Sequence, residues 1–96
     1  MASAKPTVFI DNEKTRVTEW RFAPGAATGW HRHEMNYVVV PMMDGKLKIV
    51  DGQGEATIAD LVSGQPYYRD AGVEHDVINA NDFEFAFIEV EMKPPA

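Results

Sequence analysis

The sequence contains no cysteine. Disulfide bonds, thiolate nucleophiles, zinc–thiolate sites and iron–sulfur clusters are therefore excluded, because each needs a cysteine sulfur. A chain of 96 residues buries only a modest fraction of its surface, so a bound metal or oligomerisation would help to stabilise it.

Basic residues are also scarce, since 9 Lys and Arg stand against 15 Asp and Glu, for a formal net charge of −6. This balance argues against nucleic acid and against a membrane as partners, because both attract clustered basic side chains. No apolar run is long enough to span a membrane, and the first six residues lack the apolar region of a secretory signal. We therefore expect a cytoplasmic protein whose ligand or substrate is a small molecule.

Turn-forming pairs such as Asp51-Gly52 and Ser63-Gly64 divide the chain into short segments rich in β-branched and aromatic residues. No segment has sustained helical periodicity. The pattern predicts a single all-β domain over residues 1–96, an antiparallel jelly roll, with frayed ends at residues 1–6 and 93–96. Strands are expected at residues 7–10, 16–22, 29–33, 36–40, 46–50, 55–59, 67–69, 74–78 and 83–92.

Local features of these strands lead to further expectations. The pair Asp44-Gly45 predicts a tight hairpin just before the strand at residues 46–50. Pro41 has no N–H for a central ladder, so it indicates a bulge or an exposed edge. The last strand is apolar on both faces, which predicts that one face lines the barrel and the other meets a second sheet or subunit.

The sequence has only three histidines. His31 and His33 are two residues apart, so in a strand their side chains project from the same face. His75 lies on a separate expected strand, and three imidazoles converge if that strand runs beside the first. Neutral imidazole suits zinc, copper, iron, nickel and manganese. A His-x-His pair alone is equally consistent with a surface position.

The residues around the histidines resemble two motifs of the cupin superfamily. The segment from Gly25 to His33 matches the start of the first motif, G-x5-H-x-H-x3/4-E-x6-G, and Gly45 closes it. The segment from Gly64 to Asn79 matches the second, G-x5-P-x-G-x2-H-x3-N. The resemblance implies a jelly-roll (double-stranded β-helix) cupin barrel, with one metal held inside by the motif histidines, which here are His31, His33 and His75.

The sequence departs from these motifs at two positions. Asp70 replaces the proline of the second motif, one turn residue for another. The glutamate of the first motif is absent, and its position falls at Tyr37 or Val38. Tyr37 has the inward parity of the histidines, and three roles are open to it: phenolate ligand, hydrogen-bond partner of a substrate, or wall of the pocket. By the same parity Met35 points inward as a core residue or a ligand, and Glu34 points outward.

Four further polar side chains are expected near the pocket. Arg69 is a candidate for binding a substrate carboxylate, and pairing with Asp70 or another acid at the rim is the alternative. Glu89 and Glu91 share the parity of the phenylalanines on the last strand. We expect a solvated strand end there, and an inner general base is the alternative. Asn79 is assigned a structural role.

Two classes of function fit these residues. The first is a small-molecule enzyme, a dioxygenase-like protein or a metal-assisted lyase or isomerase, with Tyr37 and Arg69 as candidate catalytic residues. Iron is the metal expected of an oxygenase, and zinc, nickel, manganese or copper are alternatives. The second class is a ligand-binding or sensing module without turnover. Resemblance to cupins also implies a homodimer, and the segment from Trp30 to Pro41 resembles small cupins associated with β-alanine degradation.

Overall fold

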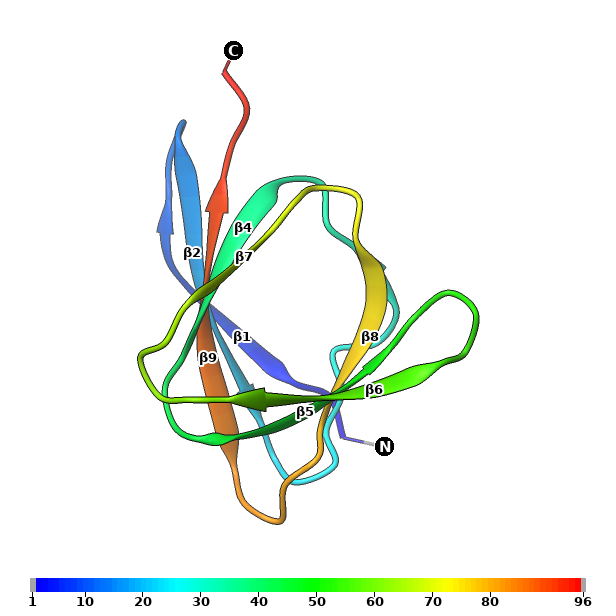
Figure 1. Ribbon diagram of the computed structural model, residues 1–96. Helices are drawn as coiled ribbons and strands as arrows, with labels where there is room; N and C mark the ends of the chain where they lie inside the picture. Colours follow the sequence, from blue (N-terminus) through cyan, green and yellow to red (C-terminus); the bar gives the residue numbers. More distant parts are fainter. Residues whose placement is uncertain (1, 96) are drawn as a thin grey trace.

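The computed structural model describes residues 2–95, which form nine strands and no helix (Figure 1). Strands β1 to β9 cover Lys5–Asp11, Thr15–Phe22, His31–Arg32, Asn36–Pro41, Gly45–Val50, Ala56–Leu61, Tyr67–Arg69, Glu74–Asn79 and Phe85–Met92. Each expected strand is present, with most ends displaced by one or two residues. These residues contain no helix long and apolar enough to cross a membrane.

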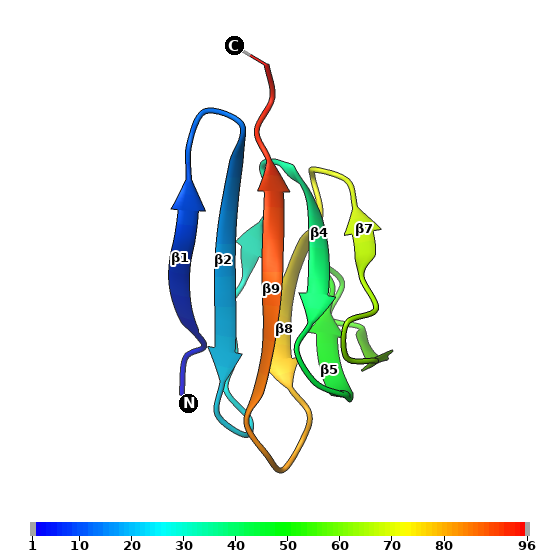
Figure 2. The same ribbon diagram turned by 90° about the vertical axis from the view of Figure 1, so that its left-hand side faces the viewer.

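The strands form two antiparallel sheets that face one another. One sheet has the order β1-β2-β9-β4-β7 and is seen face on in Figure 2, and the other has the order β3-β8-β5-β6. Most neighbours within a sheet are distant in sequence, as when β9 pairs with both β2 and β4. This arrangement confirms the predicted jelly roll.

The inward positions of β9 explain why the barrel has a packed end and a hollow end. Alternate residues point to the same face, so Phe85, Phe87, Glu89 and Glu91 all face inward. Phe85 is fully buried, and Leu47 of the opposite sheet belongs to the same apolar cluster. Burying each such side chain contributes roughly 1.5–3 kcal/mol. The apolar cluster therefore stabilises the end near Phe85, and the polar residues further along β9 face a cavity.

The turn at Asp44-Gly45 does not make the predicted hairpin. Strand β4 pairs with β7 and β9, and β5 pairs with β6 and β8, so this turn carries the chain from one sheet to the other. A Cβ atom added at Gly45 would come within 2.6 Å of the Phe85 ring. Glycine is required here because the two sheets approach closely. The resulting Asp-Gly pair has the same sequence as a hairpin turn, although it serves a different purpose.

Pro41 lies neither in a bulge nor at an exposed edge, contrary to expectation. It is a fully buried residue at the end of β4. The N–H of the next residue, Met42, donates to the Ala86 carbonyl of β9, so the Pro41 nitrogen faces the β7 side. Pairing between β4 and β7 ends at Val39. The absence of an N–H at Pro41 therefore costs no hydrogen bond of the β4–β7 ladder.

The chain start is more ordered than expected over residues 4–6. The Ala4 N–H donates to the Ala27 carbonyl, and β1 begins at Lys5. At the other end the Lys93 N–H donates to the Lys14 carbonyl. Residues 1 and 96, also expected to be frayed, lie outside the described residues.

Candidate metal centre

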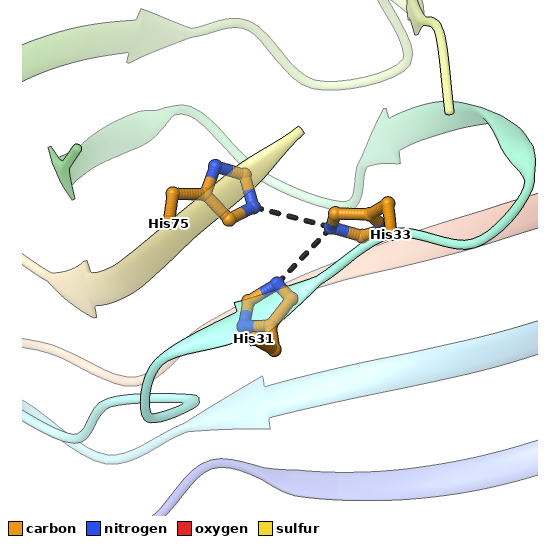
Figure 3. A group of neighbouring side chains, drawn as sticks. All are labelled: His31, His33 and His75. Carbon is orange, nitrogen blue, oxygen red and sulfur yellow. Dashed lines mark hydrogen bonds between the residues drawn. The ribbon is translucent and has the colours of Figure 1, made fainter. Parts of the chain in front are cut away.

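The three histidines meet inside the barrel, as Figure 3 shows. His31 of β3 and His75 of β8 are direct partners in the ladder between these strands, so their side chains lie on the same face. The Nε2 atom of His33 is 3.0 Å from Nε2 of His31 and 3.1 Å from Nε2 of His75. The convergence expected from the spacing is therefore present.

His33 lies just after the end of β3, and backbone hydrogen bonds hold it beside β8. Its N–H donates to the Val73 carbonyl, and its own carbonyl accepts from the Gly72 N–H, both at 2.8 Å. Gly72 has a φ of 101°, in the left-handed region that favours glycine. The glycine of the second motif therefore allows the turn that positions His33.

The hydrogen bonds of His31 set its tautomer. Its Nδ1 lies 2.9 Å from the Gly29 carbonyl oxygen, which only accepts, so this ring nitrogen carries the proton and donates. The Nε2 atom of His31 is then left with a lone pair directed at the other two rings. A carbonyl that orients the far side of an imidazole is the usual support for a metal-ligating histidine.

Burial keeps the other two rings neutral. His33 is 7% exposed, and desolvation together with the neighbouring histidines lowers the pKa of His33 and of His75 to about 4. Neutral rings are the form in which histidine binds a metal. Nitrogens bound to one ion at about 2.1 Å stand about 3 Å apart when the angle between them is near 90°. The donor atoms and their spacing therefore fit a metal ion.

Tyr37, at the position of the missing glutamate, packs directly on this group. Its ring stacks on His33 with a centroid separation of 3.8 Å, and the residue is 2% exposed. Burial raises the pKa of the Tyr37 phenol above its ordinary value. The phenol is therefore neutral at physiological pH, and its ring forms a wall of the cavity beside His33.

The inward orientation expected of Met35 does not hold, whereas Glu34 is exposed, as expected of an outward side chain. Glu34 is exposed but lines the cavity that contains the histidines, whereas Met35 does not line it. Strand β3 ends at Arg32 and β4 begins at Asn36, so the alternation of faces is interrupted between them. A one-residue parity argument cannot be extended through such a break.

The cavity around the histidines has a volume of about 220 Å³. This is smaller than the pockets that hold drug-sized molecules, so a compact ligand fits it best. Apolar side chains from both sheets line it, among them Val39 and Ile49. Arg16, Glu89 and Glu91 also line it, on the sheet opposite His31 and His75.

The expectation of a solvated strand end at Glu89 and Glu91 is wrong. The two residues are 8% and 5% exposed and face into the barrel. Arg16 of β2 forms a bidentate ion pair with Glu91, with Nε and Nη2 at 2.7 and 3.0 Å from its two carboxylate oxygens. The sequence signal was available, because Glu89 and Glu91 continue the inward alternation of Phe85 and Phe87.

Glu89 differs from Glu91 in its surroundings. Burial and the nearby Glu91 carboxylate raise the pKa of Glu89 to about 7, and Arg16 and the Trp20 side chain offset only part of this. No ion pair involving Glu89 occurs within residues 2–95. The cavity therefore holds a carboxyl group that keeps its proton to a higher pH than an exposed glutamate does.

Arg69 lies beside the cavity rather than among the side chains that line it. Its guanidinium carbon stands 4.7 Å from the centre of the Tyr67 ring, and Nη1 donates to the Tyr68 carbonyl. The Asp70 carboxylate accepts from the Tyr68 hydroxyl, and across residues 2–95 it forms no ion pair with Arg69. A role for Arg69 in catalysis stays a prediction.

Comparisons with known proteins agree with this geometry. The family described as Cupin domain matches residues 18–91. Beta-alanine degradation protein BauB of Pseudomonas aeruginosa strain PAO1 is 57% identical over 90 residues, which cover 94% of each protein. The crystal structure of a cupin domain from Bordetella pertussis Tohama I aligns with a TM-score of 0.93 and 54% identity, over 97% of this chain and 96% of that one.

A more distant likeness shows the fold alone. The crystal structure of a cupin superfamily protein from Desulfitobacterium hafniense DCB-2 aligns with a TM-score of 0.74 at 12% identity, over 96% of this chain and 79% of that one. The barrel thus persists where little of the sequence is shared. With two motifs, a jelly roll and close relatives in agreement, the chain belongs to the cupin superfamily and to the group of small cupins that includes BauB.

Proposed function

We propose that this chain is a metal-dependent enzyme that acts on a small anionic or carbonyl compound. The observation that carries the proposal is the convergence of three imidazole Nε2 atoms in a cavity of small-molecule size. Catalytic metal sites typically have three protein ligands and leave a position open for water or substrate.

His31, His33 and His75 would hold one divalent transition metal. Iron(II) is the ion expected for an oxygenase, and zinc, nickel, manganese or copper would serve a lyase or isomerase. When bound, the metal supplies Lewis-acid or redox chemistry at its open position. Three neutral imidazoles leave the ion's charge uncompensated, and this favours anionic oxygen ligands such as carboxylates and enolates.

The other cavity residues have simpler tasks in this proposal. The apolar side chains Val39 and Ile49 exclude water from the ligand. The Tyr37 ring holds His33 in place, and its hydroxyl is a candidate to orient the ligand by a hydrogen bond. Arg69 remains the candidate for steering a substrate carboxylate from the mouth.

The name of the Pseudomonas aeruginosa relative, Beta-alanine degradation protein, makes small amino-acid-derived carboxylates the first compounds to test. A binding or sensing module without turnover is the second candidate. Cupin barrels occur both as enzymes and as ligand-binding domains, and a fold does not determine a function. A centre with open positions favours catalysis over simple binding.

The deciding experiment is elemental analysis of protein purified without a metal-affinity step. We expect one transition metal per chain, together with turnover of a member of a panel of dicarbonyl compounds, amino thiols and small amino acids. Oxygen uptake assigns an oxygenase, and product without oxygen uptake assigns a lyase or isomerase. Tight binding with no product under any metal contradicts catalysis and supports the sensing module. Absence of metal from every preparation contradicts the metal-dependent enzyme.

We also propose that the chain forms a homodimer through the outer face of the sheet seen in Figure 2. Val38 and Val90 are partners on that face, as are Val40 and Ile88, and all four remain partly exposed. Adjoining apolar side chains on a sheet surface favour a protein partner. Light scattering should give twice the chain mass for the wild type and the single-chain mass for Val90→Lys, and an unchanged mass in the variant would contradict this interface.

A further inference from the structure

Glu89 is a buried acid without a charged partner of opposite sign. It is 8% exposed, lines the same cavity as the three histidines, and forms no ion pair in the part of the chain that the structure describes. The nearest basic side chain, Arg16, directs Nε and Nη2 at Glu91 instead. A buried carboxylate that lacks a cation is costly to keep, so its presence requires an explanation.

The groups around Glu89 do not supply that cation. The two strands paired with β9 contribute Arg16 and Trp20 from β2 and Tyr37 from β4, Tyr67 lies one strand further on in β7, and Glu91 lies on the same strand as Glu89. The negative charges of Glu89 and Glu91 exceed the single positive charge of Arg16. When Glu89 is ionised, this side of the cavity therefore carries one uncompensated negative charge.

Aromatic rings complete the surroundings of this carboxyl group. Trp20, Tyr67 and Phe87 line the same cavity, on β2, β7 and β9. The faces of aromatic rings attract cations, and a carboxylate among such rings is an arrangement that recognises an ammonium group. The opposite sheet presents the histidine group, which favours an anion once a metal is bound.

We propose that Glu89, in a cavity that the Trp20 and Tyr67 rings also line, binds the ammonium group of a ligand whose carboxylate faces the three histidines. The ligand is thus a small amino carboxylate that lies across the cavity from one sheet to the other. The carboxylate end of this assignment rests on the proposed metal centre, whereas the ammonium end rests on Glu89 alone. The raised pKa of Glu89, caused by burial and the Glu91 carboxylate, agrees with a site that lacks its cation.

The test is calorimetric titration of the metal-loaded protein with 3-aminopropanoate and with propanoate, which differ only in the amine. We expect the wild type to bind 3-aminopropanoate about tenfold more tightly or better, the range of a charge-assisted hydrogen bond. Glu89→Gln should lose this preference and bind propanoate as the wild type does. Glu84→Gln, which removes an exposed carboxylate outside the cavity, should keep the preference.

Equal affinity of the wild type for both probes would overturn the subsite, and so would an undiminished amine preference in Glu89→Gln. Circular dichroism checks that the variant is folded, and Glu89→Met serves as a second variant that also lacks the charge. Two further measurements distinguish this proposal from that of the metal centre. Metal content tests the centre, and binding of propylamine, which has no carboxylate, tests the ammonium subsite. A protein that holds no metal, yet binds propylamine through Glu89, would contradict the centre and keep the subsite, and failure of every amine probe to bind would contradict the subsite.

Discussion

His31 and His75 face each other as direct partners in the β3–β8 ladder, with their ring centroids 4.7 Å apart. Partners in such a ladder have their side chains on the same face, so the pairing itself brings two motifs from distant parts of the chain together. His33 is placed beside them by its backbone hydrogen bonds to Gly72 and Val73 and by stacking on Tyr37. The geometry of the centre is thus a consequence of strand register, and the following predictions depend on it.

Replacing any one of the three histidines by glutamine should lower metal affinity by roughly tenfold or more, because loss of an outer-shell partner already costs that much. Elemental analysis after dialysis against a weak chelator measures the effect. Glu74→Gln is the matched control, since Glu74 is adjacent to His75 but its side chain is exposed. If all three histidine variants keep the metal content of the wild type, the metal is bound elsewhere.

Replacements of Tyr37 should separate its ring from its hydroxyl. Tyr37→Phe keeps the stacking on His33 and should keep the metal, whereas Tyr37→Ala leaves a cavity beside that ring and should lower stability by about 3–5 kcal/mol. Chemical denaturation and metal analysis measure the two effects. Loss of turnover in a metal-loaded Tyr37→Phe variant would assign the hydroxyl a catalytic role, and full turnover would leave it only the role of a wall.

Glu89 should make the metal-free protein less stable at alkaline pH. Its pKa is about 7 in the folded state against an ordinary value of 4.5, so between these values the folded protein holds a proton that the unfolded chain has released. Stability contributed by this group therefore falls as the pH rises through that window, by up to about 3 kcal/mol in total. Glu89→Gln should consequently be the more stable protein at pH 8 and nearly equal to the wild type at pH 4, as measured by urea denaturation. If the difference in free energy of unfolding between the wild type and Glu89→Gln is the same at pH 4 and pH 8, burial of this carboxyl is contradicted.

Asn79→Ala should destabilise the fold without removing the metal ligands. The side-chain amide of Asn79 donates to carbonyls of residues 22–23 and of Phe83, and its oxygen accepts from the Asn81 N–H. Leaving such groups unpaired costs about 1–3 kcal/mol each when buried, so a loss of about 3 kcal/mol is expected. Thermal unfolding measures it, with the exposed Asn12→Ala as control. A melting temperature equal to that of the wild type would show that water replaces these bonds.

Much of the fold was predictable because its signals are local. Turn residues and β-branched segments marked all nine strands, and motif spacing picked out the three histidines. The expected hairpin at Asp44-Gly45 was wrong because the same residue types serve a turn within a sheet and a turn between sheets. Which of the two occurs depends on pairings made far away in the chain, and these are not encoded near the turn.

The two glutamates of β9 show a different limit. Charged side chains at a strand end are usually solvated, and this general expectation outweighed the alternation that Phe85 and Phe87 had set up. The burial of Glu91 is compensated by its ion pair with Arg16, a residue near the opposite end of the sequence. A partner brought close only by folding turns an unfavourable burial into a tolerated one, and composition along a single strand cannot reveal it.

The pairing of His31 with His75 also determines when the centre can exist. A peptide spanning residues 25–35 carries two of the imidazoles and no third, so the complete donor set appears only after the β3–β8 ladder has closed. An ion that binds this donor set stabilises the folded barrel relative to states in which the ladder is open. Binding therefore slows unfolding of the protein without speeding its folding. Removal of the bound metal should therefore speed the unfolding of this protein.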